Sequence, residues 1–146
     1  MGSWVFGCDI CQQVCPWNRF ATSQVDPAFD HHLDHPAINL LDELALSAQD
    51  FNHKYRHSPI KRAKRRGYLR NVAVALGNLR KLEAISPLSQ ALIFDHDPLV
   101  RAHDAWALGR IGSTSARQVL ESAAGTENDA IVKSEIQTSL AEIGQG

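Results

Sequence analysis

The second half of the chain repeats one pattern, seen most clearly as Val100-Arg101-Ala102-His103-Asp104-Ala105-Trp106-Ala107-Leu108-Gly109-Arg110-Ile111. Similar stretches occur before and after it, as Leu69-Arg70-Asn71-Val72-Ala73-Val74-Ala75-Leu76-Gly77-Asn78-Leu79 and as Val132-Lys133-Ser134-Glu135-Ile136-Gln137-Thr138-Ser139-Leu140-Ala141-Glu142-Ile143. The leucines Leu76, Leu108 and Leu140 are equally spaced along the chain, and their spacing defines the repeat period. Apolar residues recur within each copy three and four positions apart, which predicts an amphipathic helix.

A second helix is predicted before each later copy. Its apolar positions Ala84, Leu88 and Ala91 recur one repeat period later as Ala116, Leu120 and Ala123. Asp95-His96-Asp97-Pro98 predicts a turn between the two helices of one unit. Such helix-turn-helix units resemble the HEAT and armadillo class, whose repeats stack into a solenoid. We therefore predict an all-α fold, in which small Ala and Gly residues let neighbouring helices approach closely.

One aromatic residue of the repeat requires a choice between packing and binding. Trp106 occupies the position that Val74 fills one unit earlier. Because that position is apolar in both units, we interpret Trp106 as a core residue and not as a ligand-binding one.

All three cysteines lie close to the N-terminus, in Gly7-Cys8-Asp9-Ile10-Cys11-Gln12-Gln13-Val14-Cys15-Pro16-Trp17-Asn18. Bacterial-type ferredoxins hold [4Fe–4S] clusters with a C-x2-C-x2-C-x3-C-P run. Cys8, Cys11 and Cys15 match three cysteines of that run, but Val5 stands where the first would be. Since a cluster of this type needs four thiolates, we expect residues outside this chain to supply the missing ligands.

Three other interpretations of the cysteines stay open. Cys8 and Cys11 could form a zinc site with His31 and His35, whose spacing is C-x2-C…H-x3-H. A thiol redox pair would need a βαβ context that the sequence does not predict. Three ordinary buried thiols are the plainest alternative. Pro16, which turns the chain directly after Cys15, favours the iron–sulfur interpretation.

The segment from Phe20 to Asn39 is rich in His, Asp, Pro, Ser and Thr and shows no sustained period. We predict a loop there, and we interpret His31, His32 and His35 as solvated side chains.

Length and composition are those of an ordinary globular protein. The 146 residues are 44% hydrophobic, which suits one compact domain with an appended lobe. No run approaches the ~20 apolar residues of a membrane span, and no signal segment precedes the cysteines. Clustered cysteines in odd number fit a reducing compartment, so we expect a cytoplasmic, monomeric protein without a membrane partner.

The net charge of −1 conceals an uneven distribution of basic and acidic residues along the chain. Residues 51–82 contain ten Lys and Arg and no acidic residue, whereas the rest of the chain has 5 basic against 16 acidic residues. A one-sided block of this kind favours a polyanion such as nucleic acid, although it could also be only a solvated basic face.

Local signals place most of that block on a helix. Ser47 and Asp50 fit a capping box for a short helix that presents Phe51 and Tyr55. Ser58-Pro59 fits the N-cap and first position of a helix that begins at Ile60. Its first turns would carry Lys61, Arg62, Lys64, Arg65 and Arg66. Cations at a helix N-terminus oppose the macrodipole, so a phosphate at this end would stabilise them.

Two motifs together resemble the epoxyqueuosine reductase family. They are Trp4-Val5-Phe6-Gly7-Cys8 through Cys15-Pro16-Trp17-Asn18, and Ser58-Pro59-Ile60-Lys61-Arg62 through Gly67-Tyr68-Leu69-Arg70-Asn71 to Ala75-Leu76-Gly77-Asn78. The resemblance implies reduction of epoxyqueuosine to queuosine at the tRNA wobble base, with cobalamin and two [4Fe–4S] clusters. It implies that Cys8 and Cys11 bind one cluster and Cys15 the other. It also implies that Lys61, Arg62, Lys64, Arg65, Arg66 and Arg70 contact the tRNA backbone.

A complete member of that family has a cobalamin-binding catalytic domain and a first ferredoxin motif, which this chain lacks. We therefore expect a C-terminal fragment, or a reading frame begun at an internal Met1, that contains no catalytic residue. Its predicted parts are a partial ferredoxin-type segment with its loop (1–39), short helices with the basic segment (40–66) and HEAT-like repeats (67–146).

Two functions of other classes remain as alternatives. The chain could be a ferredoxin-like electron-transfer protein completed by a partner chain. It could also be a non-enzymatic HEAT-repeat binding module with a zinc site.

Overall fold

A computed structural model describes residues 2, 4–20 and 38–144, and all regular structure in these ranges is helical. The elements follow the chain in this order: α1 (Ile10–Gln13), η1 (Pro16–Phe20), α2 (Leu40–Glu43), α3 (Ala48–Lys54), η3 (Pro59–Ala63), α4 (Lys64–Leu79), η4 (Leu82–Ala84), α5 (Ile85–Phe94), α6 (Pro98–Ile111), α7 (Thr114–Thr126) and α8 (Ala130–Ile143). The prediction of an all-α fold is confirmed for the residues described.

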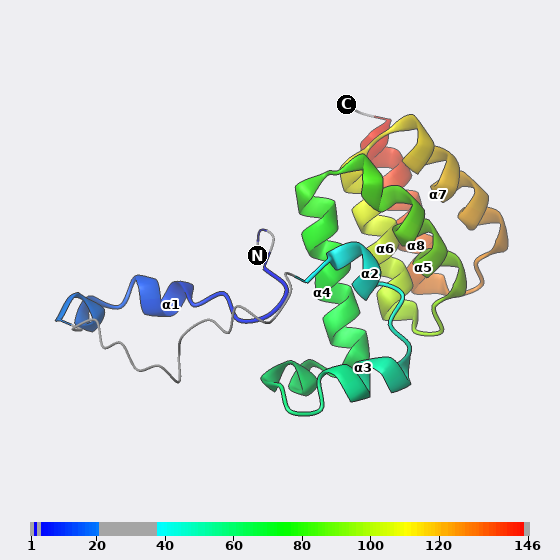
Figure 1. The fold of residues 1–146 in the computed structure, drawn as a ribbon. Helices are drawn as coiled ribbons and strands as arrows, with labels where there is room; N and C mark the ends of the chain where they lie inside the picture. The colour runs from blue at the N-terminus through cyan, green and yellow to red at the C-terminus, as the bar shows by residue number, and fades with distance from the viewer. Residues whose placement is uncertain (1, 3, 21–37, 145–146) are drawn as a thin grey trace.

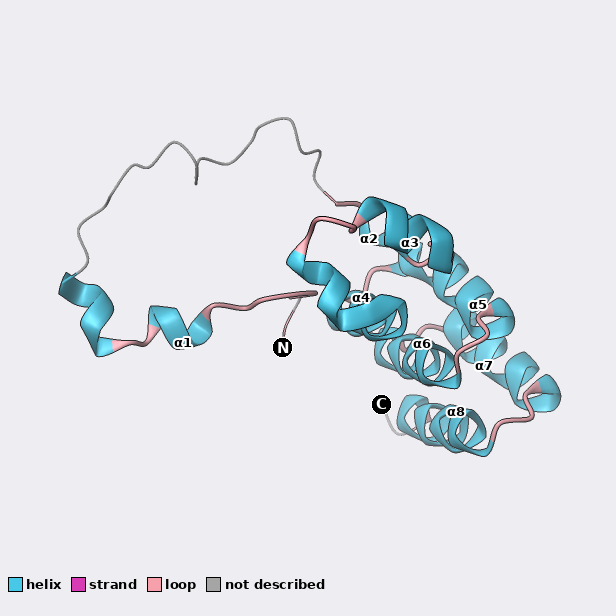
Figure 2. Ribbon diagram, turned by 90° about the horizontal axis from the view of Figure 1, so that it is seen from below, coloured by secondary structure: helices cyan, strands magenta, loops and turns pink. Residues whose placement is uncertain are grey.

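The long helices form two layers. Helices α4, α6 and α8 lie side by side in one layer, and α5 and α7 cover them in the other (Figures 1 and 2). The repeat positions Ala84, Leu88, Ala116, Leu120 and Ile136 are all fully buried between these layers. The predicted helix-turn-helix units and their stacking are therefore confirmed.

Close approach within the layer depends on two glycines. A Cβ built on Gly77 of α4 would lie 2.9 Å from Ala107 Cα of α6. A Cβ on Gly109 of α6 would lie 2.7 Å from Ser139 Cβ of α8. Real Cβ contacts are longer than this, so both positions require glycine, and the predicted close approach of helices at small residues is confirmed here.

Trp106 is only half-buried, on the outer part of the α4–α6 contact. Its Cζ3 atom packs against Gly77, at the place that a Cβ would enter. The tryptophan therefore contributes to packing but is not the fully buried core residue that the apolar repeat position suggests.

The two predicted N-caps, Ser47 and Ser58, are confirmed, and Asp97 caps a further helix. Ser47 Oγ accepts a hydrogen bond from the Asp50 backbone N–H at 3.1 Å, and Ser58 Oγ accepts one from Ile60 N–H at 3.3 Å. Asp97 before α6 accepts one from Leu99 N–H at 3.0 Å. Side chains of this type satisfy backbone donors that the first helical turn leaves free.

The prediction of one continuous helix from Ile60 is wrong. Residues Pro59–Ala63 form a 3-10 turn, and α4 begins only at Lys64. Lys64 has φ 55°, a left-handed value that interrupts the helical backbone of its neighbours. The basic residues are thus divided between a 3-10 turn and the start of α4.

Two arginines, each near the start of one helix, pair with an acid in the turn before the next helix of the same layer. Arg65 pairs with Asp95, with 2.5 Å between Nη2 and Oδ2. Arg101 pairs with Glu127, with 2.9 Å between Nε and Oε2. Asp95 and Glu127 are one repeat period apart, so the acids of the two pairs occupy the same repeat position, whereas the two arginines do not. The Arg101 hydrogen bond, helped by backbone N–H donors, lowers the pKa of Glu127 to about 2.

Candidate functional site

The cysteines lie on a segment that extends away from the helical body (Figure 1). We call residues 4–20 the cysteine arm. Cys8 and Cys11 are exposed, Cys15 is half-buried, and all three are free thiols. Asp9, with φ 48°, begins α1, and Pro16 begins η1 directly after Cys15. The backbone therefore turns before and after Cys11, and the thiols stay accessible to solvent.

The start of the chain is fixed to the first repeat. Asn71 of α4 donates a side-chain hydrogen bond to the Val5 carbonyl at 2.8 Å, and Asn78 donates one to the Gly2 carbonyl at 2.6 Å. Val5 also packs against the core. The beginning of the cysteine arm thus has a defined position on α4.

The rest of the arm exposes an apolar surface. Six large hydrophobic side chains on it are exposed: Trp4, Phe6, Ile10, Val14, Trp17 and Phe20. Scattered exposed apolar residues are ordinary, but a concentration on one short segment is typical of an interaction surface.

The fit of the arm to a metal cluster is partial. Among the described residues, no group of three His, Cys, Asp or Glu side chains is arranged to hold a metal ion. Free, accessible thiols are suitable iron–sulfur ligands, but Cys8, Cys11 and Cys15 do not form a complete site by themselves. His31 and His35 of the zinc alternative lie outside the described residues, as does His32.

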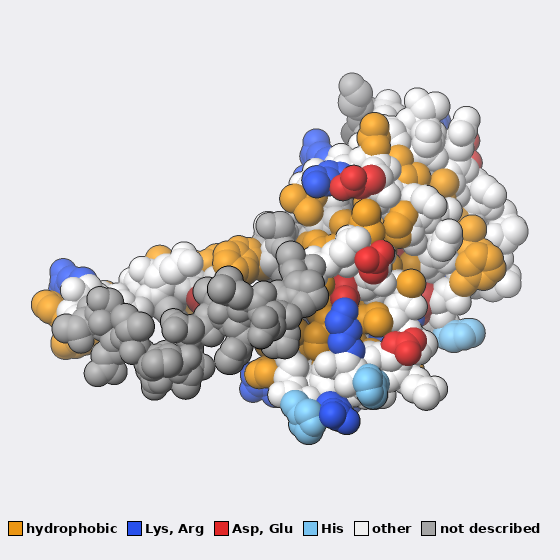
Figure 3. Space-filling model, in the orientation of Figure 1, with side chains coloured by type: hydrophobic (Ala, Val, Ile, Leu, Met, Phe, Trp, Pro, Cys, Tyr) orange, Lys and Arg blue, Asp and Glu red, His pale blue; other side chains and the backbone are white. Residues whose placement is uncertain are grey.

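The six predicted RNA-binding residues fall into two groups. Four of them, Lys61, Arg62, Lys64 and Arg66, are exposed, and none has a carboxylate partner within the described ranges. Figure 3 shows Lys, Arg and His side chains gathered at the nearby edge formed by α3 and the segment after it. We call these four residues the free basic group.

The other two basic residues have partners inside the fold. Arg65 pairs with Asp95 and donates from Nε to the Leu46 carbonyl at 2.6 Å. Arg70 is half-buried and donates from Nε and Nη2 to Asn71 Oδ1, at 3.1 and 2.9 Å. Both arginines therefore form interactions within the fold, which cannot be recognised from the number of basic residues alone.

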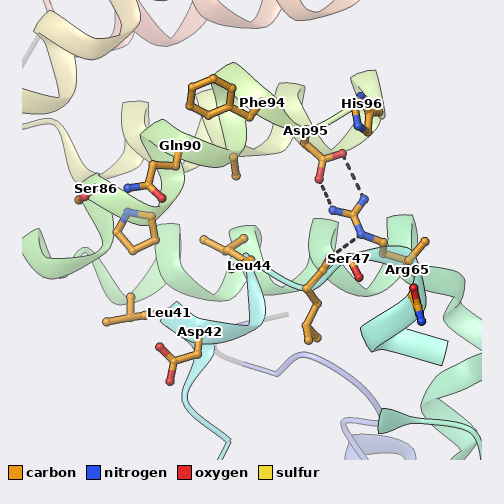
Figure 4. A pocket seen from close by; sticks show the side chains of 16 residues that line it. Leu41, Asp42, Leu44, Ser47, Arg65, Ser86, Gln90, Phe94, Asp95 and His96 are labelled. Carbon is orange, nitrogen blue, oxygen red and sulfur yellow. Dashed lines mark hydrogen bonds and ion pairs between the residues drawn. The ribbon is translucent and has the colours of Figure 1, made fainter. Parts of the chain in front are cut away.

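A groove of about 750 Å³ lies between α5 and the segment from α2 to α3. Figure 4 shows Leu41, Leu44 and Phe94 on its walls and the Arg65–Asp95 pair at one end. Its lining is more apolar than polar, and the one ion pair in it is already satisfied.

A buried carboxylate network, which the sequence did not predict, contributes Glu43, Lys54 and Tyr55 to the lining of a second cavity. Glu43, only 2% exposed, accepts hydrogen bonds from Tyr55 Oη at 2.7 Å and Tyr68 Oη at 3.0 Å, and it pairs with Lys54. The two hydroxyls are also 2.8 Å apart. Burial raises the pKa of both tyrosines, so the hydroxyls stay protonated and keep donating.

Replacing Glu43 by glutamine is expected to lower the free energy of unfolding by about 1–3 kcal/mol, because it removes the charge that Lys54 and both tyrosines satisfy. Urea denaturation measures this change. The matched control is Glu121→Gln, at an exposed i,i+4 pair with Arg117, where we expect a change within about 0.5 kcal/mol. Equal effects of the two substitutions would contradict the account of the network.

Comparison with known proteins agrees with this geometry. The family model of HEAT repeats matches residues 62–141. The chain belongs to the HEAT-repeat family. The match covers the layer of α4, α6 and α8 together with α5 and α7, and it leaves the cysteine arm outside.

Several relatives of this HEAT-repeat chain are epoxyqueuosine reductases. The one from Pseudomonas aeruginosa is 44% identical over 116 residues, which are 78% of this chain and 32% of that protein. The one from Bacillus subtilis is 30% identical over 142 residues, 96% of this chain and 36% of that protein. The chain thus spans about a third of the length of these relatives.

Solved structures extend the similarity to the whole fold. A crystal structure of epoxyqueuosine reductase with an epoxyqueuosine-modified tRNA-Tyr stem loop matches 98% of this chain and 38% of that one, with 28% identity and a TM-score of 0.83. The predicted resemblance to the C-terminal part of epoxyqueuosine reductase is therefore confirmed.

The structure also bears on the expected absence of a membrane span. Among the described helices, none is both long and apolar enough to cross a bilayer.

Proposed function

We propose that this chain is the part of an epoxyqueuosine reductase that supplies iron–sulfur ligands and a tRNA-binding surface. The observation that carries the proposal is the extent of the similarity. The Bacillus subtilis reductase matches 96% of the chain and the solved structure with a tRNA stem loop matches 98%, so these matches include the cysteine arm as well as the repeats. Reduction of epoxyqueuosine to queuosine, with cobalamin, would be completed by a portion that this chain does not contain.

In this proposal the cysteine arm (within residues 1–39) supplies Cys8 and Cys11 to one [4Fe–4S] cluster and Cys15 to another. Such clusters transfer single electrons. Two observations support this role: the three thiols are free and accessible, and the arm around them exposes apolar side chains that a further protein surface would cover. The chain alone would then hold no complete cluster.

The basic segment (within residues 40–66) and the start of the repeats (67–146) would contact the tRNA backbone. The free basic group supplies charges that no carboxylate in the described ranges neutralises, and these are suited to phosphate contacts. Arg65 and Arg70, which have partners inside the fold, would position this surface.

The cluster assignment is tested by iron analysis of a completed enzyme. The chain is joined to the part of the Pseudomonas aeruginosa relative that it does not cover, and the product is made anaerobically. We expect Cys8→Ser to remove about one cluster, roughly four iron atoms per protein. Gln13→Ser, a change at an exposed position of the same cysteine arm, is the control and should leave the iron content intact. Full iron content in Cys8→Ser would refute the assignment.

A further inference from the structure

The central helix of the repeat stack contains a carboxyl group at a core position. Val72, Asp104 and Ile136 follow one another at the repeat period and therefore occupy the same place in α4, α6 and α8. All three side chains are 0% exposed. Two units fill this place with an aliphatic side chain, and the middle unit fills it with an acid.

No hydrogen bond within the described residues offsets the cost of burying the Asp104 carboxyl group. Neither carboxyl oxygen has a hydrogen-bond partner among the described residues. Glu43 shows the opposite case in the same protein, since it is almost as deeply buried but is satisfied by two hydroxyls and a lysine. An isolated carboxylate is too costly to keep ionised in an apolar interior, and such a group takes up a proton instead.

The charged groups around Asp104 do not remove this cost. Asp95, at the end of α5, repels a negative charge on Asp104, whereas Arg65, at the start of α4, attracts it. Arg65 is already paired with Asp95 at 2.5 Å. In the described part of the chain, α7 and α8 contribute no charge that acts on Asp104. Burial, followed by Asp95, therefore raises the pKa of Asp104 well above its usual value.

We propose that Asp104 is a proton-linked weak point of the HEAT-repeat stack, so that separation of α6 from its neighbouring helices is coupled to release of a proton. The packed state holds the neutral acid. When α6 separates from α4, α5 and α8, the carboxyl group reaches water and ionises. The proton goes to solvent, and no other co-reactant is needed.

The direction of the pH effect follows from the two states. An unfolded aspartate ionises near pH ~3.9, and packed Asp104 ionises only at a higher pH. Between these two values the open state binds fewer protons than the packed state, so the stack becomes less stable as the pH rises. Glu127 acts in the opposite direction, because its lowered pKa makes its contribution disappear only in acid.

Asp104 lies on the helix that joins the first and last parts of the repeat stack. Helix α6 contacts α4, α5, α7 and α8 and is the middle of the inner layer. A local loss of stability there allows the first unit, which carries the free basic group, to move relative to the last. Segments that move in function come from the less stable parts of a fold. This inference does not depend on the proposed enzymatic role.

The test compares the wild-type chain with Asp104→Val and Asp104→Asn. Valine is the residue at the equivalent position 72, and asparagine keeps the shape of the side chain without its charge. Urea denaturation between pH 5 and pH 8 gives the folding equilibrium constant of each protein. We expect both variants to be more stable than the wild type at pH 8, with a ratio of constants that increases by up to tenfold per pH unit.

Hydrogen exchange locates the effect. We expect slower amide exchange in α6 of both variants at pH 8, with a smaller change in α7. A ratio of constants that is independent of pH, or variants less stable than the wild type at pH 8, would overturn the proposal. If valine disturbs the packing, the asparagine variant still decides the outcome, because the pH dependence of its ratio tests the proton alone.

Discussion

Replacing Gly109 by alanine is expected to lower the free energy of unfolding by about 1–3 kcal/mol, the usual cost of overpacking a core. The added Cβ would lie 2.7 Å from Ser139 Cβ and 3.2 Å from Ser139 Cα, so α6 and α8 would have to move apart. Alanine normally stabilises a helix interior by about 0.5–1 kcal/mol relative to glycine. A net loss of stability would therefore show that the steric cost at the close approach of α6 and α8 exceeds the gain in helix propensity.

Gly125 provides a matched control for this substitution. It lies in α7, and a Cβ built on it would have no atom within 4 Å. We expect Gly125→Ala to leave stability unchanged or to raise it by up to about 1 kcal/mol. A second check is the double variant Gly109→Ala with Ser139→Gly, in which the space returns and part of the loss should be recovered. Equal effects at Gly109 and Gly125 would contradict the packing account.

The second large effect is expected in RNA binding. Replacing Lys61 and Arg66 by glutamine should weaken binding of the chain to tRNA and lower the slope of log K against log salt by about two units, one for each lost phosphate contact. Both side chains are exposed, so the fold should be little affected. Fluorescence anisotropy with labelled tRNA at several salt concentrations measures the slope.

The control for RNA binding removes the same two residue types elsewhere. Arg117 and Lys133 are exposed on α7 and α8. We expect Arg117→Gln with Lys133→Gln to leave the salt dependence as it is in the wild type. If both double variants weaken binding equally, the free basic group has no special part in the interaction. Arg65 is unsuitable for such a test, because its loss would leave the buried Asp95 carboxylate without its cation.

The sequence predicted those features that depend on local spacing. The regular repeat period predicted the paired helices, and Ser47 and Ser58 marked N-caps that the structure confirms. Caps and amphipathic faces involve neighbours a few residues apart, so their signal is contained in short windows.

Features that join distant residues could not be predicted in this way. Glu43 meets Tyr68 across 25 residues, and Arg65 meets Asp95 across 30. One signal was nevertheless present, because the acids Asp95 and Glu127 share a repeat position and both pair with an arginine. The break at Lys64 had no such signal, since nothing in a run of basic residues indicates a positive φ.

The candidate site was predicted by residue type but not by environment. The basic block was found as one unit, whereas the structure separates the free basic group from Arg65 and Arg70, which have partners inside the fold. Asp104 was passed over as part of a helix, and only its complete burial without a hydrogen bond makes it exceptional.

The most direct test of the account is to measure bound iron and sulfide, together with the visible absorption spectrum, after anaerobic production of the chain alone and of the chain joined to the remainder of an epoxyqueuosine reductase. We expect little or no stable cluster in the chain alone, because three thiolates do not complete one, and two full clusters in the joined protein. Stoichiometric zinc in the chain alone, with no iron gained on joining, would contradict it and leave a HEAT-repeat binding module.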